Sequence, residues 1–361
     1  MTLLILHYRP KHLYPPLLNI ITYLDANAID YKLITSYKFR NKKSNGFWKL
    51  LSIWDYFIYI VKSIMALLLK PKNVLYIESI SVLPLVIFRK IFGLSNIKVL
   101  VHYHEYFSNE EYKKQSFFER LGRKYELKIL KRAQWISHTN QDRMDFFKKD
   151  FPMLIASKCY IMPNYPSKKW QETDTLREKK LIKEINNPIR LLHIGTLSFA
   201  GLYLSEILEH IGNDSRFTLD FYSRNEEENI INRINDYDNI KFKGSIDYNN
   251  ITNLKATYDV GLVLYKDNDN SLNFKYNAPN KIFEYLALGF DVWCSDKLLT
   301  SHNYVIDKTY PKMLLVDFED LKSFNIPKAI YRKGIDYKRS PYICEIVYDT
   351  LLKKIKEDFN H

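Results

Sequence analysis

The chain has 361 residues, of which 46% are hydrophobic and 26% charged, and its formal net charge at pH 7 is +13. This length and composition describe a globular chain of two domains and exclude a low-complexity or internally repeated protein. Its three cysteines, Cys159, Cys294 and Cys344, make neither a C-x-x-C pair nor an even disulfide set. Their spacing indicates a reducing compartment and no structural zinc.

The positive charge is concentrated in the first half of the chain. Residues 1–165 have 26 lysines and arginines against 12 acidic residues, a net charge of +14, whereas the remainder has a net charge of −1. A basic half favours an anionic partner such as nucleic acid, an acidic lipid surface or a phosphorylated substrate. A lysine-rich solvated surface is the plainer alternative.

The N-terminal half alternates between strand and helix patterns. TLLILHY (residues 2–8) predicts a short buried strand rather than a signal peptide, LLNIITYLDANAI (17–29) a helix, and DYKLITSY (30–37) a second strand. NVLYIES (73–79) and KVLVHYHEYF (98–107) continue the series. This alternation predicts a parallel sheet with right-handed crossovers.

Two apolar segments lie between these strands. In LLSIWDYFIYIVKSIMALLLK (50–70), Asp55 and Lys62 interrupt the apolar run, so we expect a buried or interfacial helix and not a spanning one. VLPLVIFRKIF (82–92) mixes apolar residues with Arg89 and Lys90. Together with the basic half, these segments favour a peripheral position on the cytoplasmic leaflet of the cell membrane.

KCYIMPNYP (158–166) predicts the end of the first domain, and a polar, charged linker follows over residues 167–186. A second α/β series begins at IRLLHIGTLS (189–198), which predicts a second domain over 187–340. The last segment, 341–361, predicts a helix with an apolar stripe at Ile343, Ile346, Val347, Leu351 and Leu352. Because ligands of doubly wound sheets bind outside the carboxyl ends of the strands, we expect the site in the cleft between the domains.

NAPNKIFEYLALGF (277–290) places polar residues at the head of an apolar helix. Pro279 suits the first helical position, and Asn280, Lys281 and Glu284 follow on one side. Free backbone N–H groups, the positive end of the helix dipole and a lysine favour a phosphate, and Glu284 suits the vicinal hydroxyls of a ribose. The pattern predicts a nucleotide-diphosphate site, although a Lys–Glu pair on a solvated helix face would have the same spacing.

APNKIFEYLALGFDVWCSD (278–296) resembles the signature P-x-K-x-x-E-Y-x-A-x-G-x-P-V-x-x-S of the retaining GT-B glycosyltransferases of family four. HYHEYF (102–107), IMPNYP (161–166) and HIGTLS (193–198) are similar to that family's histidine motif, linker start and first donor-domain loop. The resemblance implies a GT-B fold, with two Rossmann-like domains facing a cleft and the last helix returning to the first domain. It also implies that the second domain binds a nucleotide sugar, with Glu284 on the ribose.

The sequence departs from the family's pattern at two places. Tyr276 stands where the family often has a sugar-binding glutamate, and GTLSFAGLYL (195–204) lacks the arginine and lysine that often bind the diphosphate. Lys281 is the first candidate for the missing cation, with Lys266 among the alternatives. The remaining residues that we expect around the donor are Gly195, Thr196, Tyr222, Ser223, Arg224, Lys243, Pro279, Asn280 and Glu284.

VHYHEYF (101–107) places His104 and Glu105 at the carboxyl end of a strand. The resemblance implies that His104 contacts the donor sugar, and Glu105 is expected to position an acceptor hydroxyl or act as a base. Polar strand-end residues bonded to the backbone are the plainer alternative. The H-x-H pair has no evident third metal ligand, and Asp267-x-Asp269 imitates a motif of the other glycosyltransferase fold, so we expect no metal and no cofactor.

These patterns predict a glycosyltransferase with His104, Glu105 and Lys281 as catalytic residues. Its donor would be a UDP- or GDP-linked sugar, and its acceptor a lipid-linked glycan of a bacterial capsule, O-antigen or exopolysaccharide. The positive charge of Lys281 and the positive end of the helix dipole would stabilise the leaving diphosphate without a metal. The rival predictions are a GT-B-fold sugar-nucleotide epimerase and a noncatalytic carbohydrate- or nucleic-acid-binding protein, but no nucleic-acid motif is present.

Overall fold

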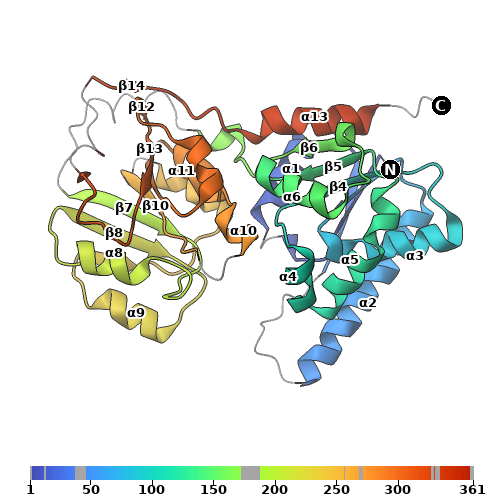
Figure 1. Cartoon of the computed structure of the whole chain (residues 1–361), viewed down its shortest axis with the longest axis horizontal. Coiled ribbons are helices and arrows are strands. Elements are labelled where there is room, and N and C mark those ends of the chain that lie inside the picture. Colours follow the sequence, from blue (N-terminus) through green and yellow to red (C-terminus); the bar gives the residue numbers. More distant parts are fainter. Residues whose placement is uncertain are drawn as a thin grey trace. The chain divides into compact units, whose positions relative to one another are not determined.

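The structure is a computed structural model that describes residues 2–11, 14–36, 46–171, 188–255, 257–267, 271–326, 329 and 334–357. The chain divides into two compact units: unit 1 is Met1–Asn164 with Cys344–His361, and unit 2 is Tyr165–Ile343 (Figure 1). The sequence predicted that the first domain ends at residue 166 and is completed by the returning helix from residue 341. Of the predicted linker, Ser167–Gln171 belongs to unit 2, with Trp170 buried in its core, and residues 172–186 lie outside the described part.

Unit 1 contains a six-stranded parallel sheet in the order β2-β1-β3-β4-β5-β6. Every residue of the LLILH and NVLYI strands is buried, as expected where helices cover both faces of a parallel sheet. The strands are β1 (Leu3–His7), β2 (Tyr31–Thr35), β3 (Asn73–Ile77), β4 (Lys98–Tyr103), β5 (Trp135–His138) and β6 (Cys159–Ile161).

The helices of unit 1 pack in groups, with α2 against α3, α3 against α5, and α1 against α13. Their starts follow from local sequence: Ser108 with Glu111 and Ser116 with Glu119 form capping boxes that begin α4 and α5. The helices are α1 (Pro15–Ala26), α2 (Gly46–Leu68), α3 (Leu83–Phe92), α4 (Asn109–Lys114), α5 (Phe117–Leu130), α6 (Gln141–Asp150) and α13 (Cys344–Lys356).

The last helix, α13, returns to unit 1, as predicted. The Asn73 side chain donates to the carbonyl oxygen of Ile355 over 3.1 Å, and the Tyr23 hydroxyl donates to the Asp349 carboxylate. The predicted apolar stripe is wrong in its first half, because the helix begins at Cys344 and leaves Ile346 64% exposed. The buried stripe is Cys344, Tyr348, Leu351, Leu352 and Ile355.

Unit 2 also contains a six-stranded parallel sheet, in the order β13-β11-β10-β7-β8-β9. Its strands are β7 (Ile189–Ile194), β8 (Phe217–Tyr222), β9 (Ile240–Phe242), β10 (Val260–Val263), β11 (Asp291–Ser295) and β13 (Met313–Val316), and β12 (Thr309–Tyr310) pairs with β14 (Asp336–Tyr337). Its α-helices include α8 (Leu204–Ile211), α9 (Glu228–Asn235), α10 (Leu272–Lys275) and α11 (Asn280–Ala287). A 3₁₀-helix spans Tyr248–Leu254.

Both sheets reverse their strand order at one point. In unit 1 the chain goes from β1 to β2 on one side and then to β3 on the other, and in unit 2 it goes from β7 to β8 and β9 and then to β10. The loops that leave the carboxyl ends of the two central strands diverge at such a switch point, which opens a crevice for ligands. The switch points therefore lie at β1/β3 in unit 1 and at β7/β10 in unit 2.

Candidate active site

Helix α11 is held against the switch point of unit 2 by Tyr285. The Tyr285 hydroxyl accepts a hydrogen bond of 2.9 Å from the backbone N–H of Ile194 at the end of β7. The ring lies so close to β10 that a Cβ atom added to Gly261 would come within 2.2 Å of it. Because only glycine leaves room for this approach, Gly261 and Tyr285 set the position of the helix head.

The head of α11 carries a polar cluster of three residues, in which Glu284 is buried and Asn280 and Lys281 are half-buried. The Lys281 ammonium donates to Oε2 of Glu284 over 2.6 Å, and the Asn280 amide donates to Oε1 over 2.7 Å. The side chain of Glu284 is only 2% exposed and that of Lys281 15%. The spacing that suggested a solvated Lys–Glu pair thus produces a largely buried pair. A buried ion pair recovers its desolvation cost only with further hydrogen bonds, which Asn280 supplies here.

The N-terminus of α11 has no described side-chain cap. Pro279 is the N-cap residue and Asn280 the first helical one, so the expectation that Pro279 is the first helical residue was one position early. The Ile282 N–H is bonded to the Pro279 carbonyl oxygen. At an uncapped helix head the first N–H groups and the positive end of the dipole favour an anion.

His193 lies beneath the first loop of unit 2, a position that sequence reasoning missed. Its Nδ1 atom is 3.1 Å from the carbonyl oxygen of Leu262, and its Nε2 atom is buried with no hydrogen-bond partner among the described residues. Burial lowers the pKa of His193 to about 4, the bond to Leu262 opposes this shift, and the charge of Lys281 adds to it. A Cβ on Gly195 would lie 3.3 Å from Nε2, so glycine keeps the loop close to a neutral imidazole.

The other predicted donor residues lie after β7 and β8. The Gly195 N–H donates to the Tyr222 carbonyl oxygen, and the Ser223 N–H donates to that of Gly244. Thr196 and Arg224 are exposed, Tyr222 is half-buried and Ser223 is buried. These residues therefore border the same end of the sheet as α11, and their roles stay predictions.

Two of the alternative cations, Lys243 and Lys266, are engaged elsewhere, whereas Arg224 is exposed after β8. Lys243 follows β9, two strands or roughly 10 Å from β7 in the sheet, and its ammonium is 3.7 Å from Asp220. Lys266 forms an ion pair of 2.6 Å with Glu206. Lys281 stays the first candidate, because it lies in the first turn of α11 itself.

Glu78 is the central residue of a second polar cluster, at the β1/β3 switch point of unit 1. It follows β3 with φ 65° and ψ 150°, a conformation that a non-glycine residue adopts at an energetic cost. Its Oε1 atom accepts the backbone N–H groups of His104 (2.7 Å) and Glu105 (3.3 Å) and the Tyr14 hydroxyl (3.4 Å). Burial and the nearby Glu105 raise the pKa of Glu78 to about 8. The acidic residue that ends the apolar run NVLYI was the available signal.

His104 lies at the end of β4 and is 4% exposed. Its Nδ1 atom is 3.0 Å from the amide oxygen of Asn164, and its ring meets that of Tyr14 edge-on with centroids 4.6 Å apart. Burial lowers the pKa of His104 to about 3, so the imidazole is neutral near pH 7. The two motifs HYHEYF and IMPNYP are therefore joined by the His104–Asn164 contact.

Two arginines border this cluster. Arg143 on α6 is 3% exposed and donates to the His104 carbonyl oxygen over 2.5 Å. Burial alone lowers the pKa of Arg9, which follows β1, but the negative charge of Glu78, Glu105 and other neighbours raises it overall. The partly exposed Glu105 thus lies in a site with positive charge close to it.

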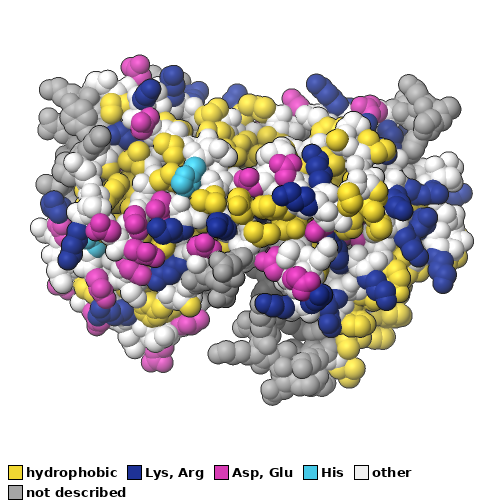
Figure 2. All heavy atoms as spheres, viewed as in Figure 1, with side chains coloured by type: hydrophobic (Ala, Val, Ile, Leu, Met, Phe, Trp, Pro, Cys, Tyr) yellow, Lys and Arg dark blue, Asp and Glu magenta, His cyan; other side chains and the backbone are white. Residues whose placement is uncertain are grey.

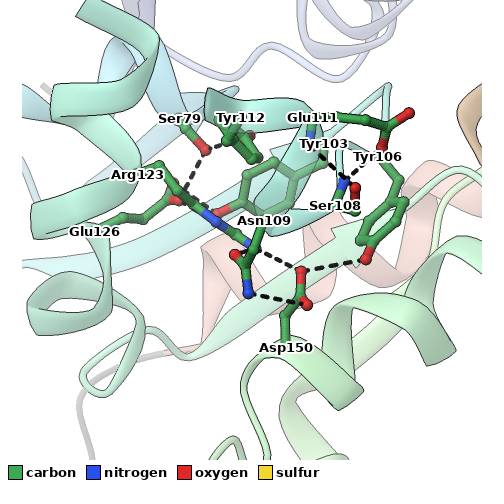
Figure 3. Close-up of polar contacts among 10 residues, drawn as sticks. All are labelled: Ser79, Tyr103, Tyr106, Ser108, Asn109, Glu111, Tyr112, Arg123, Glu126 and Asp150. Atoms are coloured by element: carbon green, nitrogen blue, oxygen red, sulfur yellow. Dashed lines mark hydrogen bonds and ion pairs between the residues drawn. The ribbon is translucent and has the colours of Figure 1, made fainter. Parts of the chain in front are cut away.

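A buried network behind this cluster supports the segment after β4 (Figure 3). Glu126 accepts hydrogen bonds from Tyr103 (2.7 Å) and Ser79 (2.8 Å), and Arg123 pairs with Asp150 at 2.8 Å. A Cβ on Gly122 would come 2.2 Å from the Ser79 carbonyl oxygen, so this glycine lets α5 approach the backbone directly after Glu78. The network therefore holds the strained backbone at Glu78 in place.

Metal ligands do not gather in the described part of the chain, where no group of three or more His, Cys, Asp or Glu side chains could hold an ion. Asp267 is described but Asp269 lies outside the described residues, so the D-x-D pattern is not placed. The absence of a metal requirement stays a prediction.

No protein-family model matches the sequence, and no curated protein matches it at a significant level. Solved structures match it along nearly its whole length. The lipopolysaccharide outer core galactosyltransferase WaaB is 11% identical with a TM-score of 0.63, covering 98% of this chain and 99% of its own. HepE of Anabaena, in complex with UDP and glucose, is 10% identical with a TM-score of 0.62 and the same coverage.

Sucrose-phosphate synthase of Thermosynechococcus elongatus is 14% identical, with a TM-score of 0.60 over 98% of this chain and 96% of its own. At these identities the similarity shows the fold. The chain has the GT-B fold of glycosyltransferases, as its two parallel six-stranded sheets and the return of α13 to unit 1 also indicate.

Proposed function

We propose that the protein is a glycosyltransferase that takes a sugar from a nucleotide diphosphate. The observation that carries the proposal is the hydrogen-bonded Asn280–Lys281–Glu284 cluster, with a buried Glu284, at the uncapped head of α11 and at the switch point of the sheet. Backbone N–H groups and Lys281 suit a diphosphate, and the Glu284 carboxylate suits the hydroxyls of a ribose. HepE, which shares the fold, is described in complex with UDP and glucose, so UDP-sugars are the first donors to test.

In the proposed reaction the bond between the sugar's anomeric carbon and the diphosphate breaks, and the diphosphate leaves with the electron pair. The helix head and Lys281 stabilise its growing charge. The acceptor's hydroxyl oxygen forms the new bond to the anomeric carbon on the face from which the diphosphate leaves, as retention in one step requires, and Glu105 positions that hydroxyl and takes its proton. His104, neutral because of its burial, offers Nε2 to a sugar hydroxyl. The resemblance of residues 278–296 to the family-four signature supports retention of the anomeric configuration.

We further propose that the acceptor is a lipid-linked glycan of a bacterial surface polysaccharide and that the protein works at the cytoplasmic leaflet. The support is the basic charge of residues 1–165, which suits a polyprenyl diphosphate, and the apolar helices of the same unit. We propose that no metal or other cofactor takes part, since the helix head and Lys281 supply the positive charge.

The test is to incubate the protein with radiolabelled UDP- and GDP-sugars, with and without lipid-linked glycan acceptors from bacterial membranes and with and without EDTA. We expect label to enter the lipid fraction in the presence of acceptor, with EDTA making no difference, and the label to stay in the donor for Lys281→Met. Conversion of a UDP-sugar to its epimer without acceptor would contradict the proposal, and so would the absence of nucleotide binding.

A further inference from the structure

Helix α2 exposes an unbroken apolar face. Between Leu50 and Leu68 it is long and apolar enough to cross a membrane by length and composition, yet only 28% of this window is buried. Figure 2 shows apolar side chains gathered over α2, with lysines and arginines beside them. The exposed residues recur at helical spacing and share one face: Leu50, Ile53, Trp54, Phe57, Val61, Met65 and Leu68.

Apart from the exposed Lys62, several polar groups of α2 point the other way. The Tyr56 hydroxyl donates to the carbonyl oxygen of Ile80, and the Tyr59 hydroxyl to that of Ser81. The Asp55 carboxylate accepts a hydrogen bond of 2.5 Å from Ser36, and Ser63 is fully buried. A helix on a water-exposed surface has the opposite arrangement, with its apolar face inward and charges outward. The exposed face of α2 is therefore made for an apolar environment.

The packing of α2 excludes a transmembrane orientation. Tyr56 and Tyr59 in its first half and Ala66 and Leu67 near its end are all buried within unit 1. The helix also packs on α3 and on strands β1 and β2 along this length. Because one side of α2 is packed on the domain from Tyr56 to Leu67, the helix can meet a bilayer only side-on, in the plane of the interface.

The charges around this face favour an anionic lipid surface over a second copy of the chain. Unit 1 has 29 lysines and arginines against 16 acidic residues, so it holds the whole net charge of +13. Lys62 and Lys70 lie on or just after α2, and Lys90 lies on α3 beside the exposed Ile91. Two such faces would repel each other, whereas anionic headgroups attract them.

We infer that α2 lies in the headgroup region of an anionic membrane, with Trp54 and Phe57 inserted and the lysines of α2 and α3 at the phosphates. The inference rests on the proposed function only for its purpose, which is to bring the enzyme to a lipid-linked acceptor. Binding itself requires neither a donor sugar nor the α11 cluster.

The test is sedimentation of the full chain with vesicles of phosphatidylcholine, alone or with about 30% phosphatidylglycerol. The test variant is Trp54→Glu/Phe57→Glu, whose side chains are 59% and 51% exposed, and the matched control is Ile346→Glu on α13, 64% exposed in the same unit. We expect binding to the anionic vesicles that weakens with salt, a loss of at least about tenfold in the test variant, and no change in the control.

Trp54 gives a second readout, because Trp135, Trp170 and Trp293 are buried and Trp48 is present in both proteins of the difference measurement. We expect anionic vesicles to shift its emission to the blue, measured as the difference between wild type and Trp54→Phe. Equal binding by Trp54→Glu/Phe57→Glu, no binding by wild type, or a stable dimer that the same variant dissociates would overturn the inference. UDP binding by the variant, measured in parallel, separates these outcomes from failure of the donor site.

Discussion

Lys281 Nζ, in the first turn of α11, lies 2.6 Å from Glu284 Oε2 one turn later, and both side chains are largely withdrawn from water. Such a pair contributes less to stability than its short distance suggests, because each charge gives up hydration. Its place at an uncapped helix head, beside the neutral His193, is better explained by ligand binding than by folding. The pair can hold Glu284 oriented for a ribose while the lysine faces a diphosphate.

The Lys281–Glu284 pair should show coupling in a double-mutant cycle. Glu284→Gln leaves the ammonium of Lys281 unpaired, so we expect a loss of about 1–3 kcal/mol in the free energy of unfolding in urea. Lys281→Met should lose a similar amount, and the double variant clearly less than the sum. Additive losses would show that the two charges do not interact in solution.

Gly261→Ala should displace α11. The added Cβ would lie 2.2 Å from the Tyr285 ring, and a buried aromatic ring has little room to move, so we expect a loss of about 1–3 kcal/mol and weaker nucleotide binding. Gly201→Ala is the control, because its Cβ would make an ordinary contact of 3.7 Å with Ser198. Equal stability of the two variants would contradict the close packing of helix and strand.

Glu78 should make stability depend on pH above its ordinary pKa. Between pH 4.5 and about 8 the folded protein keeps the proton on Glu78 while the unfolded chain releases it, so stability falls as pH rises through this window. Relative to Glu78→Gln, wild type should lose about 3–5 kcal/mol of unfolding free energy from pH 4.5 to 8. If the difference in unfolding free energy between wild type and Glu78→Gln did not depend on pH, the raised pKa of Glu78 would be contradicted.

His193 should destabilise the protein in acid. The pKa of His193 in the folded protein is about 4. Between pH 6.5 and 4 the unfolded chain therefore binds a proton that the folded protein does not bind, so the free energy of unfolding falls as pH falls through this range. His193→Asn, which keeps a donor for Leu262, should reduce this loss by about 2–3 kcal/mol at pH 4. Urea unfolding of wild type and His193→Asn at several pH values measures it, and equal pH dependence of the two would contradict the burial of this imidazole.

Much of the architecture could be predicted because it follows from local patterns. Buried runs such as LLILH and NVLYI lead to parallel strands, and Pro279 and Gly289 bracket α11. The polar spacing at Asn280, Lys281 and Glu284 was confirmed as a cluster on one side of the helix, although its burial was not expected.

The features that could not be predicted depend on contacts between segments that are far apart in the sequence. Glu78 becomes central because the N–H groups of His104 and Glu105, on another strand, converge on its carboxylate. In the sequence His193 looks like an ordinary strand residue. It gains a charged neighbour only because the fold brings Lys281 on α11 close to it. The outward face of α2 was also hidden, because an apolar run of this length is equally consistent with a core helix.

The central claim is that α11 binds the donor's nucleotide diphosphate, and titration calorimetry with UDP, GDP and their sugars on wild type and Glu284→Ala tests it most directly. We predict that one nucleotide binds wild type and that Glu284→Ala weakens it by at least about tenfold, the equivalent of about 1.4 kcal/mol. The fold of the variant is checked by circular dichroism. Unchanged affinity in the folded variant, or no binding of any nucleotide to wild type, would contradict the account.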